Sequence, residues 1–167
     1  MSKKKNRSKE ILWWALGGAI VLGIFWLAFT APKRPASSIT TREVALTCTT
    51  DMATVFHIHP HLAVTFDGQP QEIPTNIGIE PGCMNSLHTH DTSGSIHVES
   101  PEKRDFTLAD FFAVWKKPFD RTQILDQKVD AAHRISVTVN GTAVDTYENT
   151  VLSDQDQVVI SYEALPK

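Results

Sequence analysis

Residues 56–66 read Phe-His-Ile-His-Pro-His-Leu-Ala-Val-Thr-Phe, an alternation of apolar and polar side chains. Successive side chains of a β-strand point to opposite faces. The alternation therefore predicts a strand with an apolar face and a second face that carries His57, His59 and His61. Pro60 has no backbone N–H to donate, which predicts an edge position or a bulge at that point. The stretch indicates a sheet that packs on one side and presents imidazoles on the other.

A second histidine pattern follows in residues 87–99, where Leu-His-Thr-His is joined by Asp-Thr-Ser-Gly to Ser-Ile-His-Val-Glu. The joining segment is rich in turn formers, so we expect an antiparallel pair of strands around it. In that register His90 lies opposite Ser95 and His88 lies opposite His97. Directly opposed side chains have Cβ atoms about 4.5–5.5 Å apart, which would bring these imidazoles together.

The predicted cluster of His88, His90 and His97 has the composition of a metal site. Neutral imidazole binds Zn²⁺ and Cu²⁺ at about 2.0–2.1 Å, and three such ligands leave one position open. Converging histidines without an ion would repel one another when protonated. We therefore expect Cu²⁺ or Zn²⁺ here. The first histidine group consists of His57, His59 and His61. These residues can complete this site, form a second site or support the ligands of the first.

We expect three other polar residues to have roles different from metal binding. Glu99 shares the predicted histidine face and is expected to hold an imidazole in one tautomer through a hydrogen bond. Asp91 could do the same, but it is expected only to start the turn. His133 is remote in sequence and is expected to have a surface role.

The rest of the chain predicts one helix and further strands. Thr107 has the features of a helix N-cap, and apolar residues spaced i, i+3, i+4 and i+7 follow it up to Pro118. Asp67-Gly68 and Asn140-Gly141 are typical of tight hairpin turns. The pattern from Asn140-Gly141 to the C-terminus is similar to the last strands of ubiquitin-like β-grasp domains. We expect an α+β protein with one helix packed on a mostly antiparallel sheet.

The segment before this domain has three parts. Residues 1–10 are basic, residues 11–31 are apolar and uncharged, and residues 32–42 are rich in Pro, Ser and Thr, as expected for a linker. About 20 apolar residues span a bilayer, which predicts a single transmembrane helix. The positive-inside rule places the N-terminus in the cytoplasm and residues 43–167 outside the cell membrane. A cleaved signal peptide is the alternative, although its apolar region is normally about 7–15 residues long.

The chain has two cysteines, Cys48 and Cys83, on either side of the first histidine stretch. An oxidising compartment favours a disulfide, which would stabilise the fold by roughly 3–4 kcal/mol in the chain-entropy model. The alternative is that one or both thiolates bind metal, with Met52 or Met84 adding a softer sulfur ligand suited to Cu⁺.

Three motifs carry a family resemblance: His-Ile-His-Pro-His-Leu at residues 57–62, Leu-His-Thr-His-Asp at residues 87–91 and Ile-His-Val-Glu-Ser-Pro at residues 96–101. With these motifs, residues 48–162 resemble an uncharacterised family of small bacterial and archaeal proteins that are membrane-anchored or secreted. The resemblance implies an extracytoplasmic domain with the boundaries given above. It implies no activity.

Three functions fit these patterns. The first is a metal-binding module that delivers, senses or buffers Cu²⁺ or Zn²⁺. The second is an enzyme in which a three-histidine metal activates water and Glu99 acts as general base, but the sequence has no nucleophile motif. The third is a metal-free interaction domain whose imidazoles respond to pH near about 6. The expected partners are a metal ion, the membrane and a protein that exchanges the ion, and the folded part lacks the basic stripe of a nucleic-acid binder.

Overall fold

The structure is a computed structural model that describes residues 39–166. The predicted basic segment, the transmembrane helix and most of the linker lie outside the described residues. Within residues 39–166 no helix has both the length and the hydropathy needed to span a bilayer. The membrane anchor therefore stays a prediction.

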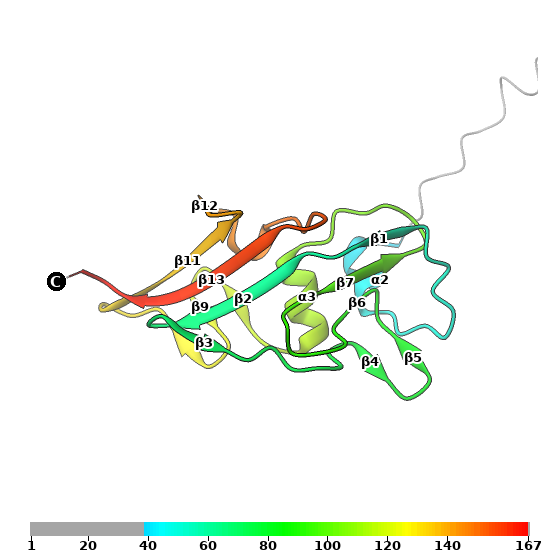
Figure 1. The fold of residues 1–167 in the computed structure, drawn as a ribbon, viewed down its shortest axis with the longest axis horizontal. Helices are drawn as coiled ribbons and strands as arrows, with labels where there is room; N and C mark the ends of the chain where they lie inside the picture. The colour runs from blue at the N-terminus through cyan, green and yellow to red at the C-terminus, as the bar shows by residue number, and fades with distance from the viewer. Residues whose placement is uncertain (1–38, 167) are drawn as a thin grey trace, which may run out of the picture. The chain divides into compact units, whose positions relative to one another are not determined.

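A five-stranded sheet is the largest sheet among the described residues (Figure 1). Its central strands β13 and β2 are parallel, and all other neighbours are antiparallel. The order is β12 (Thr142–Val144), β11 (His133–Val139), β13 (Gln157–Ala164), β2 (His61–Phe66) and β3 (Gln69–Gln71). The similarity of the C-terminal pattern to ubiquitin-like β-grasp domains stays a prediction.

The two predicted hairpin turns are present in this sheet. Asp67 and Gly68 join β2 to β3 with φ values of 47° and 79°, and Asn140 and Gly141 join β11 to β12 with 52° and 79°. Positive φ at both central residues matches the right-handed twist of the strands, which explains the choice of Asp-Gly and Asn-Gly. The mostly antiparallel α+β class is confirmed.

Helix α3 (Leu108–Trp115) covers the apolar core. Thr107 is the N-cap, as predicted, and its backbone N–H donates to the Asp110 carboxylate at 2.9 Å, which is the Asp110 half of a capping box. The Thr107 hydroxyl donates to the same carboxylate at 2.9 Å. The helix ends at Lys116 with φ of 60°, two residues before Pro118, so a left-handed C-cap ends it before the proline. Its buried face meets the apolar residues of β2, β11 and β13 in one core cluster.

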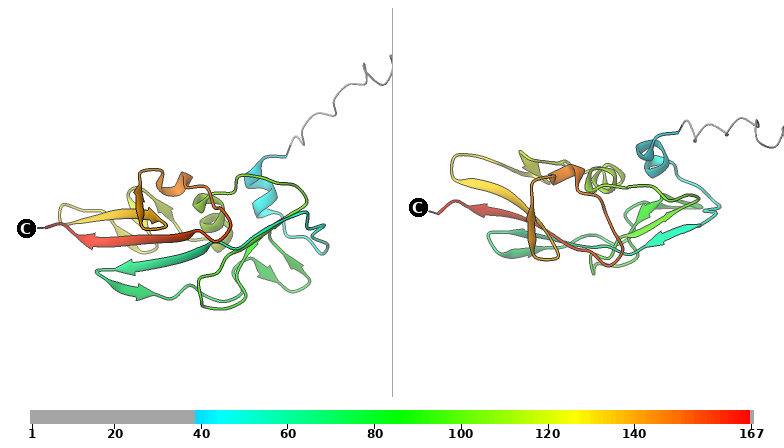
Figure 2. Two further views of the ribbon diagram at one scale, coloured as in Figure 1. Left: turned by 45° about the horizontal axis from the view of Figure 1, so that its top comes forward. Right: turned by 90° about the horizontal axis from the view of Figure 1, so that it is seen from above.

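A three-stranded sheet that carries His57, His88 and His97 lies beside α3 (Figure 2). Its central strand β7 pairs antiparallel with a strand on each side. One face of this sheet is apolar and buried, through Ile58, Leu87 and Val98. The strands are β1 (Phe56–Ile58), β7 (His97–Ser100) and β6 (Leu87–His88).

The prediction of one continuous strand over residues 56–66 is wrong. The strand ends at Ile58 and resumes at His61, and the two halves belong to different sheets. Proline cannot donate a ladder hydrogen bond, so Pro60 breaks the pairing between them. His59 N–H instead donates to the Asp154 carboxylate at 2.8 Å, and the Pro60 carbonyl accepts from Ile96 N–H at 2.9 Å. The chain therefore crosses from one sheet to the other at residues 59–60.

The short helix α2 (Thr41–Leu46) begins within the segment predicted as a linker. Thr40 and Glu43 form a capping box at its start. Arg42 pairs with buried Asp110 of α3 at 2.9 Å and donates to the Ala109 carbonyl at 2.7 Å. These contacts hold α2 against α3. The remaining elements are β4 (Ile79–Glu80), β5 (Cys83–Met84), β8 (Phe119–Asp120), β9 (Gln123–Ile124), β10 (Gln127–Lys128) and the 3-10 helix η1 (Tyr147–Asn149).

The predicted disulfide between Cys48 and Cys83 is present, with Cα atoms 5.4 Å apart. It joins β5 to the segment that follows α2. Since both sulfurs are bonded to each other, neither thiolate is available as a metal ligand in this state.

Candidate metal centre

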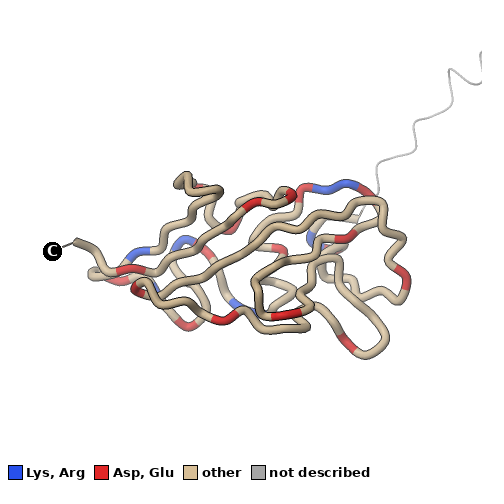
Figure 3. The backbone as a smooth tube through the Cα atoms, viewed as in Figure 1, with Lys and Arg blue, Asp and Glu red and all other residues tan. Residues whose placement is uncertain are grey.

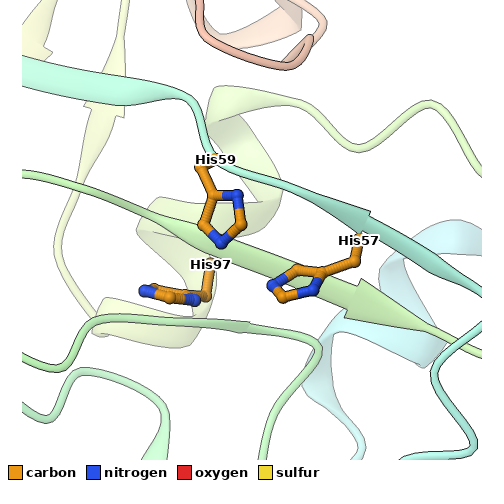
Figure 4. Close-up of side chains that lie close together, drawn as sticks. All are labelled: His57, His59 and His97. Carbon is orange, nitrogen blue, oxygen red and sulfur yellow. The ribbon is translucent and has the colours of Figure 1, made fainter.

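Five imidazole rings converge on the open face of the three-stranded sheet, and His97 of β7 lies at their centre. Its ring centroid is 4.6 Å from that of His90, 4.7 Å from His59, 5.4 Å from His88 and 5.9 Å from His57. Figure 4 shows the rings of His57 and His59 directed toward His97. The predicted clustering of histidines is therefore confirmed for five of the six candidates.

The five rings form two groups whose ligand atoms can meet at one ion. In the inner trio, His88, His90 and His97 each offer a ring nitrogen, and these atoms lie within 4.8 Å of one another. In the outer trio, His57, His59 and His97 satisfy the same condition. Both trios use His97, so the two predicted histidine patterns meet at this residue.

His88 lies on β6, directly opposite His97 of β7. The residue is fully buried, and its Nδ1 lies 3.1 Å from the backbone carbonyl of Asn85. A carbonyl can only accept, so Nδ1 carries the proton and Nε2 carries the lone pair. Nε2 is buried and has no hydrogen-bond partner in the structure. This tautomer, fixed by a backbone carbonyl, is the one that metal-binding histidines use.

His90 reaches the cluster by a route that differs from the predicted one. Strand β6 ends at His88, and Ser95 pairs with His61 instead of His90. Buried Thr89 holds this segment: its hydroxyl donates to the Pro74 carbonyl at 2.8 Å and accepts from Ile77 N–H at 3.1 Å. These side-chain bonds replace the expected hairpin ladder and leave the exposed His90 ring beside His97.

Gly94 lets the loop that follows His90 lie against β2. Its φ is +88°, and a Cβ there would lie 2.2 Å from the Leu62 carbonyl oxygen. The close approach allows Leu62 N–H to donate to the Gly94 carbonyl at 2.8 Å. Asp91 accepts from Ser93 N–H at 2.8 Å, and hydrogen bonds from Ser93 lower the pKa of Asp91. Asp91 has the turn role that the sequence suggested.

Glu99 faces the outer trio. Strand pairing places it opposite His57, and its carboxylate lies 3.2 Å from His57 Nε2. The His57 side chain is 42% exposed, whereas that of Glu99 is only 19% exposed. Glu99 thus occupies the predicted position for a carboxylate that orients an imidazole.

Two histidines lie outside both trios. His61 follows Pro60 into the five-stranded sheet, where its ring lies beside Gly94, so the predicted shared face with His57 is lost at the strand break. His133 stacks on Tyr162, and its Nδ1 lies 2.9 Å from the Asp130 carboxylate. Sequence spacing alone could not separate His61 from its neighbours.

The cluster favours uncharged imidazoles. Burial, opposed by the hydrogen bond to Asn85, lowers the pKa of His88. Burial also lowers the pKa of His97, and the surrounding histidines lower it further. Neutral rings keep their lone pairs free for a cation at neutral pH. Figure 3 shows the Lys and Arg positions of residues 39–166 in several separate segments of the fold.

No family model, curated protein or solved structure matches the chain. The family resemblance of the three motifs stays a prediction. The geometry of the histidine cluster therefore carries the functional argument.

Proposed function

We propose that this protein binds Cu²⁺ or Zn²⁺ through the inner trio of His88, His90 and His97, for delivery, sensing or buffering of the ion. The observation that carries the proposal is the buried Nε2 of His88, which has no hydrogen-bond partner. Leaving a buried polar atom unpaired costs about 1–3 kcal/mol. Coordination of an ion by this lone pair would remove that cost.

The ligand geometry supports an ion that exchanges. Two nitrogens bound to one tetrahedral ion lie about 3.4 Å apart, so atoms already within 4.8 Å need only small ring rotations. Three protein ligands leave a position for water or for a partner's ligand. His90 is exposed, which gives the ion a path to solvent. Imidazole ligands bind Cu²⁺ more tightly than Zn²⁺ by the Irving–Williams order.

The disulfide supports an extracytoplasmic location. Disulfides persist in oxidising compartments and are rare in the cytosol. With the apolar segment of residues 11–31 as a single-pass anchor, the domain would meet metal ions outside the cell membrane. Its protein partner for metal transfer would also be found there.

A hydrolytic enzyme is the second candidate, and Glu99 is the observation that favours it. Glu99 lies beside His57 of the outer trio, where a carboxylate could accept a proton from water bound to a metal held by that trio. In that role Glu99→Gln would leave the metal content unchanged and abolish ester hydrolysis or CO₂ hydration. Equal activity in Glu99→Gln and in the unmodified protein would exclude this role.

The proposal is tested by metal binding to the full-length chain, purified in detergent without a chelator or a histidine tag. We expect the first equivalent of Cu²⁺ or Zn²⁺ to bind at neutral pH, and His97→Ala to weaken it at least about 100-fold because both trios lose a ligand. The control His61→Ala should bind like the unmodified protein. Circular dichroism would show that each variant is folded.

Two results would contradict the proposal. One is an unmodified protein that binds neither ion at neutral pH, which would leave a metal-free interaction domain. The other is a folded His97→Ala variant with unchanged affinity, since the ion would then lie elsewhere.

A further inference from the structure

We infer that the histidine cluster holds two ions at saturation and that His97 is a ligand of both. The inner ion would bind to His88, His90 and His97, and the outer ion to His57, His59 and His97. This inference rests on the proposed function, because it adds a second position to the same site.

The arrangement of the rings argues against one ion shared by all five histidines. His57 and His59 form one pair, with centroids 4.3 Å apart, and His88 and His90 form another, at 4.9 Å. Ring contacts join each of these four residues to His97, but among residues 39–166 none joins one pair to the other. The two trios whose ligand atoms lie within 4.8 Å of one another each contain one pair and His97, and among residues 39–166 no such trio mixes the pairs.

His97 can serve two ions because an imidazole has two nitrogens. Figure 4 shows them at opposite ends of the ring, one of them toward His57 and His59. When both nitrogens bind metal, the ring loses its N–H proton to water and bridges the ions as imidazolate. Its negative charge then lies between the two cations and reduces their repulsion.

The outer position has its own support. The Glu99 carboxylate lies 3.2 Å from His57 Nε2, so a negative charge stands beside the outer trio. His59 is fixed at its backbone, where N–H donates to Asp154 at 2.8 Å. However, His57 is 42% exposed whereas His88 is fully buried. We therefore expect the inner position to fill first and the outer position to exchange faster.

The test is a Cu²⁺ titration of the full-length chain in detergent, followed by electron paramagnetic resonance at about pH 7.5. An imidazolate couples two Cu²⁺ spins, so the signal should grow over the first equivalent and fall over the second. The double variant His57→Ala/His59→Ala should bind one Cu²⁺ with its full signal. Because both residues are on the more open side of the cluster, this variant should fold. His61→Ala should behave like the unmodified protein.

The outcomes separate the two proposals. Failure to bind even the first equivalent would overturn the proposed function. Binding of one equivalent only, with no second ion at excess Cu²⁺, would overturn the shared site and leave the proposed function intact. A second equivalent that adds a full, uncoupled signal would also overturn the shared site, because the two ions would then have no common ligand.

Discussion

Side chains alternate between the two faces in both main sheets of this domain, but the two sheets carry different residues on these faces. In the five-stranded sheet, alternate residues of β2, β11 and β13 are buried against the core that α3 covers. In the three-stranded sheet, Ile58, Leu87 and Val98 are buried on one face while imidazoles and Glu99 occupy the other. The chain crosses between the sheets at residues 59–60. Both sheets thus contribute apolar residues to one core cluster, whereas the candidate metal chemistry lies on the three-stranded sheet and the residues beside it.

The largest expected effect is a loss of stability without a loss of metal binding. Phe111 of α3 has no exposed surface and lies in the core cluster. Phe111→Ala should reduce the free energy of unfolding by about 3–5 kcal/mol, because the truncation removes apolar contacts and leaves a cavity. Urea unfolding would measure this change. At low urea, where the variant is folded, its Cu²⁺ affinity should equal that of the unmodified protein, and a parallel loss of affinity would contradict the separation of the core cluster from the histidine cluster.

A second comparison uses a matched pair of glycines to test the contact between β2 and the loop that follows His90. Gly94 and Gly141 both have positive φ, at 88° and 79°, but only at Gly94 would a Cβ collide with the backbone, 2.2 Å from the Leu62 carbonyl. Gly141→Ala should cost about 1 kcal/mol, and Gly94→Ala should cost roughly 3 kcal/mol because the loop must also move. Only Gly94→Ala should weaken Cu²⁺ binding, since the moved loop begins at His90. Equal effects on affinity in both variants would refute the positioning role of Gly94.

The smallest expected effect is a pH dependence confined to the histidine face. The pKa values of His88 and His97 are lowered, so the unfolded chain binds more protons than the folded one below the ordinary histidine pKa of 6.5. Without metal, the free energy of unfolding should therefore fall as the pH falls from about 7.5 to about 5.5. Carboxylates such as Asp120, whose pKa is lowered from 3.8, lose their contribution only at lower pH.

Urea unfolding in the presence of a chelator at these two pH values would measure the effect. His97→Asn removes one of the two groups and should reduce the difference. A free energy of unfolding that does not change across this range would contradict the burial of neutral imidazoles in the cluster.

The parts of the fold that depend on local chemistry were predictable from sequence. Thr107 begins a helix because its neighbour three residues on can complete a capping box, and Asn140-Gly141 turns because both residues accept positive φ. The pairing of His88 with His97 followed from the turn-forming segment between them. The disulfide followed from cysteine number and the expected compartment.

The parts that depend on contacts between distant segments were not predictable in the same way. Pro60 indicated a break in pairing, but not that the halves of the strand would join different sheets. The placement of His90 depends on Thr89, whose bonds go to Pro74 and Ile77. The membership of His57 and His59 in a trio depends on β1 pairing with β7, which no local pattern specifies.

The position of β13 has a consequence for how the protein is made. Residues 157–164 form the central strand of the five-stranded sheet, and its parallel partner β2 precedes it by roughly ninety residues. Pairings so far apart in sequence form slowly, and this one cannot form until residue 164 has left the ribosome. Until then β2 has an unpaired edge, and the connection through residues 59–60 has no fixed support from Asp154. The nascent chain would thus emerge with its histidines unassembled, and we expect the histidine cluster to form only after synthesis is complete.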